Sequence, residues 1–254
     1  MLILGGGLIA LAVALVTLLS WSAQYLAAWI PFSYEQDMAS SYVDKLDTPA
    51  SPMQSYLQRL ADGLADKMDL PAGMTVTVHY VDSDTVNAFA TLGGHMVIYR
   101  GLVQATPSEN ALAMVIGHEI AHIKHRDPII ALGRGVLVGS VLAVLAGVNG
   151  NSLAGKLLGD AGLLTTLHFS RSQESEADRA GLEALALYYG HVADAGKIFE
   201  HFRAQEKHGL SLPAFFRTHP ASDNRLETLR TIARQHGWSL KGELTPLAVR
   251  AEKS

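Results

Sequence analysis

Residues 118–122 read His-Glu-Ile-Ala-His, which is the H-E-x-x-H pattern. Residues four apart on an α-helix lie one above the other, so His118 and His122 can bind one metal ion from the same helix face. Glu119 would then reach a water molecule at that ion and act as its base. The pattern predicts the zinc site of a hydrolase. The alternative is a pair of surface histidines beside a solvated glutamate.

Signals on both sides of the motif predict the helix that carries it. Thr106-Pro107-Ser108-Glu109 is a capping box with proline at the first helical position, and Asp127-Pro128 forbids continuation of the helix. His125 shares the histidine face, but three ligands on consecutive turns of one straight helix cannot form a tetrahedron. We interpret His125 as a cation at the helix end, where the helix dipole favours positive charge.

A catalytic zinc ion needs a third protein ligand and an open position for water. The chain after His122 lacks the glycine and third histidine of the longer H-E-x-x-H-x-x-G-x-x-H motif. The better candidate lies in residues 170–178, which read SRSQESEAD. Ser170 and Gln173 form a capping box for a second helix, and Gly190 predicts its end.

Two carboxylates of this second helix, Glu174 and Asp178, continue its apolar stripe. A buried carboxylate requires a cation or hydrogen-bond donors. We therefore predict Glu174 as the third zinc ligand and Asp178 as the acceptor of an N–H from a ligating histidine. The alternative is a solvated charged face, neutralised by Arg171 and Arg179.

Residues 75–81, before the motif helix, alternate apolar and polar residues as a half-buried strand does, and residues 86–90 and 95–99 are two further strand candidates. Gly93-Gly94 supplies a turn between the second and the third. The predicted fold class is α+β, mostly helical, with a small antiparallel sheet and one transmembrane helix before it.

Composition excludes several functions. The 254 residues contain no cysteine, so a thiolate zinc site and a disulfide framework are both impossible. Twenty Lys and Arg against 24 Asp and Glu give a net charge of -4, without a basic block. Nucleic acid is therefore not expected as a partner.

The N-terminal segment is predicted to be a membrane anchor. Leu2–Leu19 is apolar and as a helix would extend roughly 27 Å, about the hydrocarbon thickness of a bilayer. Interfacial aromatic residues follow at Trp21, Tyr25 and Trp29. The basic region of a cleaved signal peptide is missing. We expect an anchor and interfacial segment over residues 1–31 and a peptidase domain over 32–254.

The flank of this anchor predicts its orientation. The first charges after it are Glu35, Asp37 and Asp44, and Lys45 is the earliest base. A flank poor in Lys and Arg does not hinder translocation, so we expect a catalytic domain outside the cytoplasm.

A second apolar run, Ile129–Val148, lies between the ligand helices. His122 and Glu174 must reach the same ion from one side of the membrane, so the chain between them crosses zero times or twice. A second crossing through residues 153–168 would place Lys156 and Asp160 in hydrocarbon. We therefore predict a helical hairpin, residues 129–148 and 153–168, packed on the domain. The oligomeric state is left open.

Roughly residues 85 to 230 resemble the gluzincin membrane metallopeptidases that include HtpX and the CAAX prenyl proteases. The matching positions, in the family's order, are Asn87-Ala88-Phe89-Ala90, Gly93-Gly94, Gly101-Leu102, residues 118–122, Arg171, Glu174, Ala177, Asp178, Thr218-His219-Pro220 and Arg225. The resemblance implies one Zn²⁺ per chain, bound by His118, His122 and Glu174, with Asp178 as outer partner. It also implies that His219 and Arg225 face the substrate carbonyl. Only one clear span is present, so the chain is similar to the single-pass bacterial branch.

The predicted function is a membrane-anchored zinc endopeptidase for misfolded membrane or envelope proteins. An extended peptide substrate would pair with the sheet edge at Asn87, Ala88, Phe89 and Ala90. One alternative is a non-catalytic membrane-anchored chaperone or binding module that keeps the fold. Another is a latent enzyme, in which the His219 loop or residues 129–148 cover the zinc ion.

Overall fold

The computed structural model describes most of the segment that follows the N-terminal apolar run. The described residues are 29–44, 46, 50–145, 168–207, 213–219 and 224–247, with single residues and short stretches between 14 and 27. Most of the predicted anchor, Leu2–Leu19, and nearly all of the predicted second hairpin arm, residues 153–168, lie outside them. None of the helices within the described part is long and apolar enough to cross a membrane.

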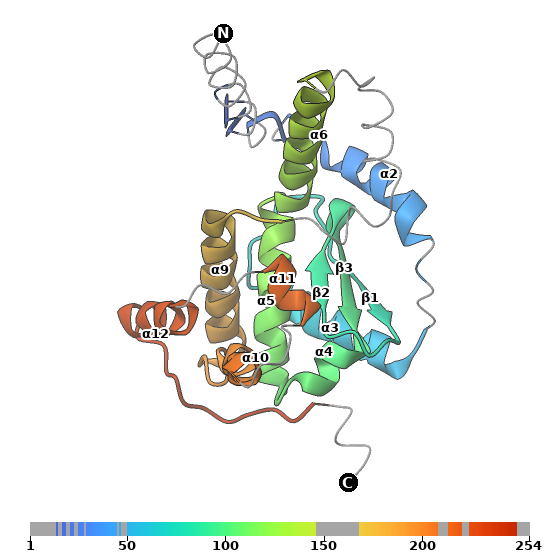
Figure 1. Ribbon diagram of the computed structural model, residues 1–254. Coiled ribbons are helices and arrows are strands. Elements are labelled where there is room, and N and C mark those ends of the chain that lie inside the picture. Colours follow the sequence, from blue (N-terminus) through green and yellow to red (C-terminus); the bar gives the residue numbers. More distant parts are fainter. Residues whose placement is uncertain are drawn as a thin grey trace.

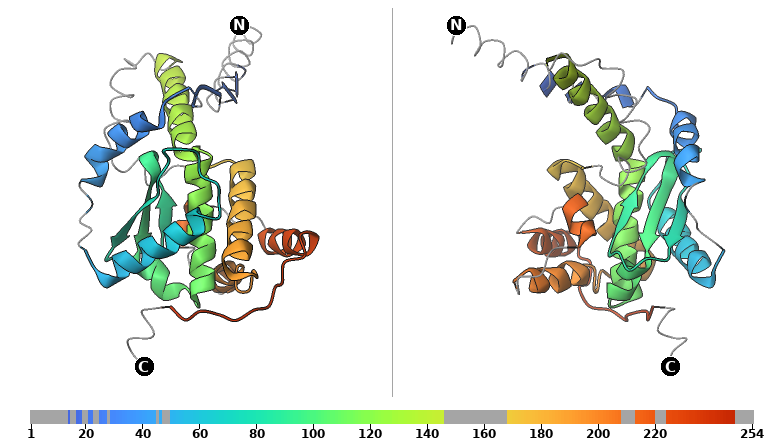
Figure 2. Two further views of the ribbon diagram at one scale, coloured as in Figure 1. Left: turned by 180° about the vertical axis from the view of Figure 1, so that it is seen from behind. Right: turned by 45° about the vertical axis from the view of Figure 1, so that its right-hand side comes forward.

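Two helices form the centre of the domain, α5 (Glu109–Lys124) and α9 (Arg171–Tyr189). The sheet lies on one side of α5 and α9 on the other (Figure 1, Figure 2). The remaining helices are α2 (Phe32–Val43), α3 (Pro52–Ala65), α4 (Arg100–Ala105), α6 (Asp127–Leu145), α10 (Lys197–Lys207), α11 (Ala214–Thr218) and α12 (Arg225–Gln235). The predicted α+β, mostly helical fold is confirmed.

The predicted boundaries of α9 are confirmed. Ser170 and Gln173 form the reciprocal capping box, and Gly190 ends the helix with φ 76°. The start of α5 differs slightly from the prediction. Ser108 is the N-cap and accepts from the N–H of Ala111, so Pro107 lies before the helix and not inside its first turn.

The end of α5 also differs from the prediction. Lys124 is its last residue, and Arg126 follows in the left-handed region with φ 59°. Asp127-Pro128 then begins α6, because proline is tolerated in the first turn of a helix, where its N–H is not needed. The described part of the first predicted hairpin arm, residues 129–145, is therefore helical, and it joins α5 through a bend.

The sheet contains three strands, β1 (Thr77–Val81), β2 (Ala88–Ala90) and β3 (His95–Tyr99), in the order β1-β3-β2. β2 pairs with β3 antiparallel through the turn η1 (Leu92–Gly94), but β1 pairs with β3 parallel. The prediction of an antiparallel sheet is wrong for β1. Alternating polarity identifies strands, but it does not show which strand lies in the middle.

The two edges of this sheet differ. Two glutamine side chains of α3 cover the edge of β1: Gln54 Oε1 accepts from the N–H of Tyr80 at 2.7 Å and Gln58 Oε1 from that of Val78 at 2.8 Å. Their amide groups donate to the carbonyls of Val78 and Val76. The β1 edge is therefore paired with side chains, and β2 is the edge strand beside α5.

Apolar side chains form two separate cores. The main core joins α3, the sheet, α5, α9 and the C-terminal helices. The second core lies at the end of the domain where α2 and α6 meet (Figure 1). Its buried members are Ala27, Ala39, Leu92, Ile129, Ile130, Ala131, Leu132 and Phe169.

Candidate metal centre

Two glycines let the central helices approach closely. A Cβ atom on Gly181 of α9 would lie 2.9 Å from the backbone nitrogen of His118, and one on Gly117 would lie 3.1 Å from the Cα of Gly181. Any larger residue would clash with backbone. The contact places Glu174 and Asp178, which lie two turns and one turn before Gly181, against the two motif histidines.

Four side chains converge at this helix contact: His118 and His122 from α5, Glu174 from α9 and His219 from the end of α11. We call them the metal cluster. Each offers one ligand atom, and these atoms all lie within 4.8 Å of one another. All four side chains are buried. Three were predicted as ligands, whereas His219 was expected to face the substrate.

The spacing within the metal cluster matches a coordination sphere. Zinc–ligand distances of 2.0–2.1 Å place neighbouring ligand atoms of a tetrahedron about 3.3 Å apart. His118 Nε2 lies 3.1 Å from His122 Nε2 and 3.5 Å from Glu174 Oε2. His219 Nδ1 lies 3.0 Å from Glu174 Oε1 and 3.3 Å from His118 Nε2. If His118, His122 and Glu174 held a zinc ion, His219 Nδ1 would lie near the fourth vertex of its tetrahedron.

The donor chemistry also fits a cation. Glu174 Oε2 and His219 Nε2 are buried without a hydrogen-bond partner among the described residues. Burial by itself raises the pKa of Glu174, but hydrogen bonds from His118, His122 and His219 outweigh it and lower that pKa. Burial likewise lowers the pKa of His118, yet Asp178 and Glu174 raise it to about 9. The centre therefore has an excess of anionic groups, which favours positive charge.

A carboxylate orients each motif histidine from behind. His118 Nδ1 donates to Asp178 Oδ1 at 3.0 Å, as predicted for Asp178. His122 Nδ1 donates to Asp127 Oδ2 at 2.7 Å, a contact that the sequence analysis missed. There Asp127 was interpreted only as part of a helix stop. These bonds leave both Nε2 atoms turned toward the centre.

Arg225 lies behind the metal cluster, on the side of α9. Its Nη2 donates to Asp178 Oδ1, and its Nη1 is 3.8 Å from Glu174 Oε2. The guanidinium carbon also lies 4.1 Å from the centre of the Phe199 ring. Arg225 is thus placed to support Asp178, whereas the resemblance implied a place at the substrate carbonyl together with His219.

Glu119 lies between the metal cluster and the edge strand. Its Oε2 accepts from the N–H of Ala90 in β2 at 2.7 Å, and its Oε1 lies 3.5 Å from His219 Nε2. Asn87, Ala88, Phe89 and Ala90, the predicted substrate strand, are all buried. The segment of α11 lies against this strand, because the N–H of Phe215 donates to the carbonyl of Val86 at 3.3 Å.

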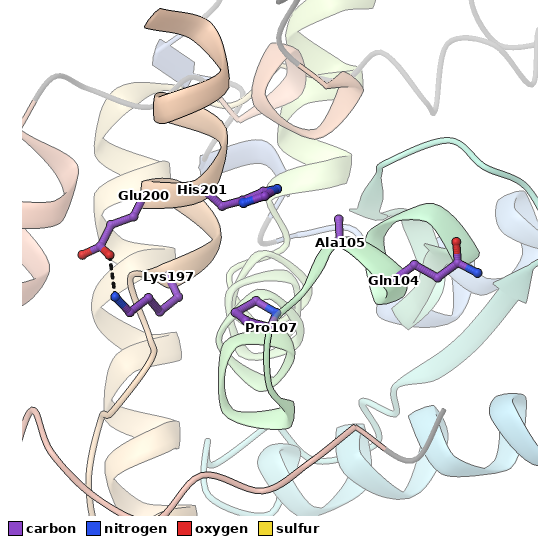
Figure 3. A pocket seen from close by; sticks show the side chains of 6 residues that line it. All are labelled: Gln104, Ala105, Pro107, Lys197, Glu200 and His201. Atoms are coloured by element: carbon purple, nitrogen blue, oxygen red, sulfur yellow. Dashed lines mark hydrogen bonds and ion pairs between the residues drawn. The ribbon is translucent and has the colours of Figure 1, made fainter. Parts of the chain in front are cut away.

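A separate hollow of about 530 Å³ lies near the other end of α5 (Figure 3). Gln104, Ala105 and Pro107 line one side, and Lys197, Glu200 and His201 of α10 line the other. Lys197 and Glu200 form an ion pair at its wall. No residue of the metal cluster is among these lining residues.

Residues 51–233 match Peptidase family M48. This range covers more than half of the chain and contains every predicted site residue. The chain belongs to peptidase family M48. The predicted resemblance is confirmed, and so is the enzyme class that the H-E-x-x-H motif predicted. Glu35 and all of α2 lie before the range that matches the M48 family.

Named M48-type relatives come from bacteria and mitochondria. The chain is 32% identical over 170 residues to the beta-barrel assembly-enhancing protease of Yersinia pestis, covering 62% of this chain and 34% of that protein. It is 30% identical over 172 residues to the mitochondrial metalloendopeptidase OMA1 of Danio rerio, covering 60% and 34%. A protease HtpX homolog of Burkholderia cenocepacia is 30% identical over 195 residues, covering 62% and 68%. The chain thus spans about a third of the first two relatives.

Proposed function

We propose that this chain is a zinc endopeptidase in which His118, His122 and Glu174 bind the ion. The observation that carries the proposal is the closeness of these groups: His118 Nε2 lies 3.1 Å from His122 Nε2, and each lies 3.5 Å from a carboxylate oxygen of Glu174. Bound zinc supplies Lewis-acid chemistry, making a water molecule acidic and polarising the scissile carbonyl. Asp127 and Asp178 hold the two imidazoles in the tautomer that this requires.

Glu119 is the general base of this proposal. The N–H of Ala90 holds its Oε2, and Oε1 is buried without a hydrogen-bond partner among the described residues. Oε1 is therefore the oxygen that takes the proton from the attacking water. The same oxygen then delivers that proton to the leaving amine.

The substrate peptide pairs with β2. The glutamines of α3 occupy the other edge of the sheet, and the N–H of Ala90 at the β2 edge already reaches Glu119. A peptide that adds a strand at β2 would bring its backbone to the base and the metal cluster. Backbone pairing also gives affinity with little dependence on side chains, which suits misfolded proteins.

The described conformation corresponds to a latent state. His219 Nδ1 lies among the ligand atoms and would compete with water for a bound ion, and the N–H of Phe215 in α11 donates to the carbonyl of Val86, just before the substrate strand. Catalysis requires this segment to move. In the described, closed conformation the Nε2 of His219 lies beside Glu119. Once the segment has moved, in the open state, His219 would be the hydrogen-bond donor that faces the oxyanion, which is the role that the resemblance implies.

The N-terminal segment attaches the enzyme to a membrane in this proposal. Trp21, Tyr25 and Trp29 are exposed by 59%, 53% and 85%, as expected for rings at a bilayer interface. In this proposal the chain is a bacterial inner-membrane protein with an extracytoplasmic catalytic domain. From that position it could reach misfolded membrane and envelope proteins as substrates. The name of the Yersinia pestis relative, which refers to beta-barrel assembly, agrees with an envelope substrate.

The test compares the full chain with its Glu119→Gln variant. The amide keeps the size of the side chain but cannot accept the proton, so both proteins should bind one zinc ion and only the wild type should cleave casein or itself. Metal content is measured by mass spectrometry and cleavage by gel. Hydrolysis by the variant at the wild-type rate would refute the mechanism.

A further inference from the structure

A buried ion pair docks α2 onto the peptidase domain. Glu35 is 2% exposed, and its Oε1 accepts from Arg126 Nε at 2.6 Å. Arg126 Nη1 also donates to the carbonyl of Ala27 at 2.9 Å, and Glu35 Oε2 accepts from the N–H of Gly93 at 3.5 Å. These contacts join the N-terminal segment to the α5–α6 bend and to the turn after β2. We call this pair the clamp.

Arg126 occupies a special place in the backbone. It is the residue between the metal-binding helix and α6, and its φ of 59° is unfavourable for a side chain with a Cβ atom. The contacts with Glu35 and Ala27 hold it there. The next residue, Asp127, accepts a hydrogen bond from His122 Nδ1 at 2.7 Å. The backbone at Arg126, together with the Gln173 amide that donates to Asp127 Oδ1, therefore sets the direction of the carboxylate that orients His122.

A second contact joins the same segment to the same histidine. Ala27 and Ala39 pack in the second core together with the first turns of α6 and Phe169. The Phe169 ring stacks on the His122 imidazole, with ring centres 4.1 Å apart and planes at 28°. One packing unit therefore includes the N-terminal segment and one face of a metal ligand (Figure 2 shows α2 beside the start of α6).

We propose that Ala27 and α2 form a positioning element of the metal centre, which acts on His122 through Glu35, Arg126 and Asp127. The inference rests on the proposed function, since it concerns the same metal site. Arg126 and Glu35 touch neither the substrate nor the ion, so they are positioning residues. The metal affinity of the peptidase domain depends on whether the N-terminal segment is docked. Displacement of α2, by tension on the segment before it or by a competing partner, would loosen His122.

The experiment uses the full chain and the variants Glu35→Gln, Arg126→Gln and the double variant. Zinc affinity is measured by competition with a chelator, and ligand geometry by the visible absorption of the cobalt(II)-substituted protein. Loss of an outer partner typically weakens metal binding by 10–100-fold. Because the clamp acts one residue further out, we expect about a 10-fold loss and a changed cobalt spectrum in each single variant. The loss in the double variant should be smaller than the product of the two single losses, since both single variants break the Glu35–Arg126 pair.

Arg234→Gln is the matched control. It breaks an exposed ion pair with Glu227 on α12, at 3.1 Å, and should change neither affinity nor spectrum. Wild-type affinity in the clamp variants, with only a lower melting temperature, would show that the clamp is merely structural and would overturn the inference. If Arg126→Gln does not fold, the isosteric Glu35→Gln decides. A wild-type chain that binds no zinc would instead overturn the proposed function, and the inference with it.

Discussion

Replacing one glycine tests whether helix packing sets the metal site. In Gly181→Ala the new Cβ would lie 2.9 Å from the backbone nitrogen of His118 and 3.2 Å from the carbonyl carbon of Gly117. Unstrained contacts of this kind begin at about 3.5 Å, so α9 must move away from α5 by about 0.6 Å. Both neighbours are backbone atoms, which cannot rotate aside. Glu174 and Asp178 move with α9, whereas the histidines stay on α5.

Gly133→Ala in α6 is the matched control, because a Cβ there meets no atom within 4 Å. Both variants gain about 1 kcal/mol of helix propensity, so this contribution cancels when they are compared. The remaining difference is the cost of overpacking, about 1–3 kcal/mol in the free energy of unfolding. For a chain of this size each kcal/mol corresponds to about 2–4 °C in melting temperature.

The assay is thermal unfolding of the metal-free chain followed by circular dichroism, together with zinc affinity from chelator competition. We expect Gly181→Ala to melt several degrees below Gly133→Ala. It should also bind zinc more weakly, since metal sites tolerate displacements of only about 0.5 Å. If Gly181→Ala is stabilised as much as Gly133→Ala and binds zinc like the wild type, the helices do not need this glycine and the reasoning is refuted.

Four further outcomes are expected. Glu174→Ala should lower zinc occupancy, because it removes one of three proposed ligands, and full occupancy by metal analysis would exclude Glu174 as a ligand. Asp127→Asn should weaken zinc binding by about 10–100-fold in chelator competition, and an unchanged affinity would contradict its role behind His122. His219→Ala should keep the metal but change the cobalt(II) absorption spectrum, since water replaces Nδ1; an unchanged spectrum would show that His219 is not at the fourth vertex. Burial lowers the pKa of His79 to about 4, below its usual value near 6.5. Between these two pH values the unfolded chain binds more protons than the folded chain, so stability should fall as pH drops from about 6.5 to 4. His79→Gln should flatten this dependence of melting temperature on pH, and an equal slope in both proteins would argue against a contribution of His79.

Features that depend on a few neighbouring residues could be predicted from the sequence. The capping box at Ser170 and the left-handed Gly190 define α9 through contacts within a single turn. The spacing of His118 and His122 brings both imidazoles to one helix face by the helical period alone. Glu174 and Asp178 could be found because carboxylates on an apolar stripe need a cation or donors. These conclusions required no knowledge of how distant segments meet.

The tertiary structure decided what joins distant segments. β3 lies between β1 and β2, and β1 pairs with it in parallel. Alternating polarity encodes neither the order nor the direction of the strands. Asp127 reaches His122 across the backbone bend at Arg126, whose side chain is bound by Glu35 of a remote helix. The position of His219 at the metal cluster likewise depends on how α11 packs against β2. The local sequence around each of these residues is compatible with several positions of its segment in the fold. Packing over the whole domain selects one of these positions.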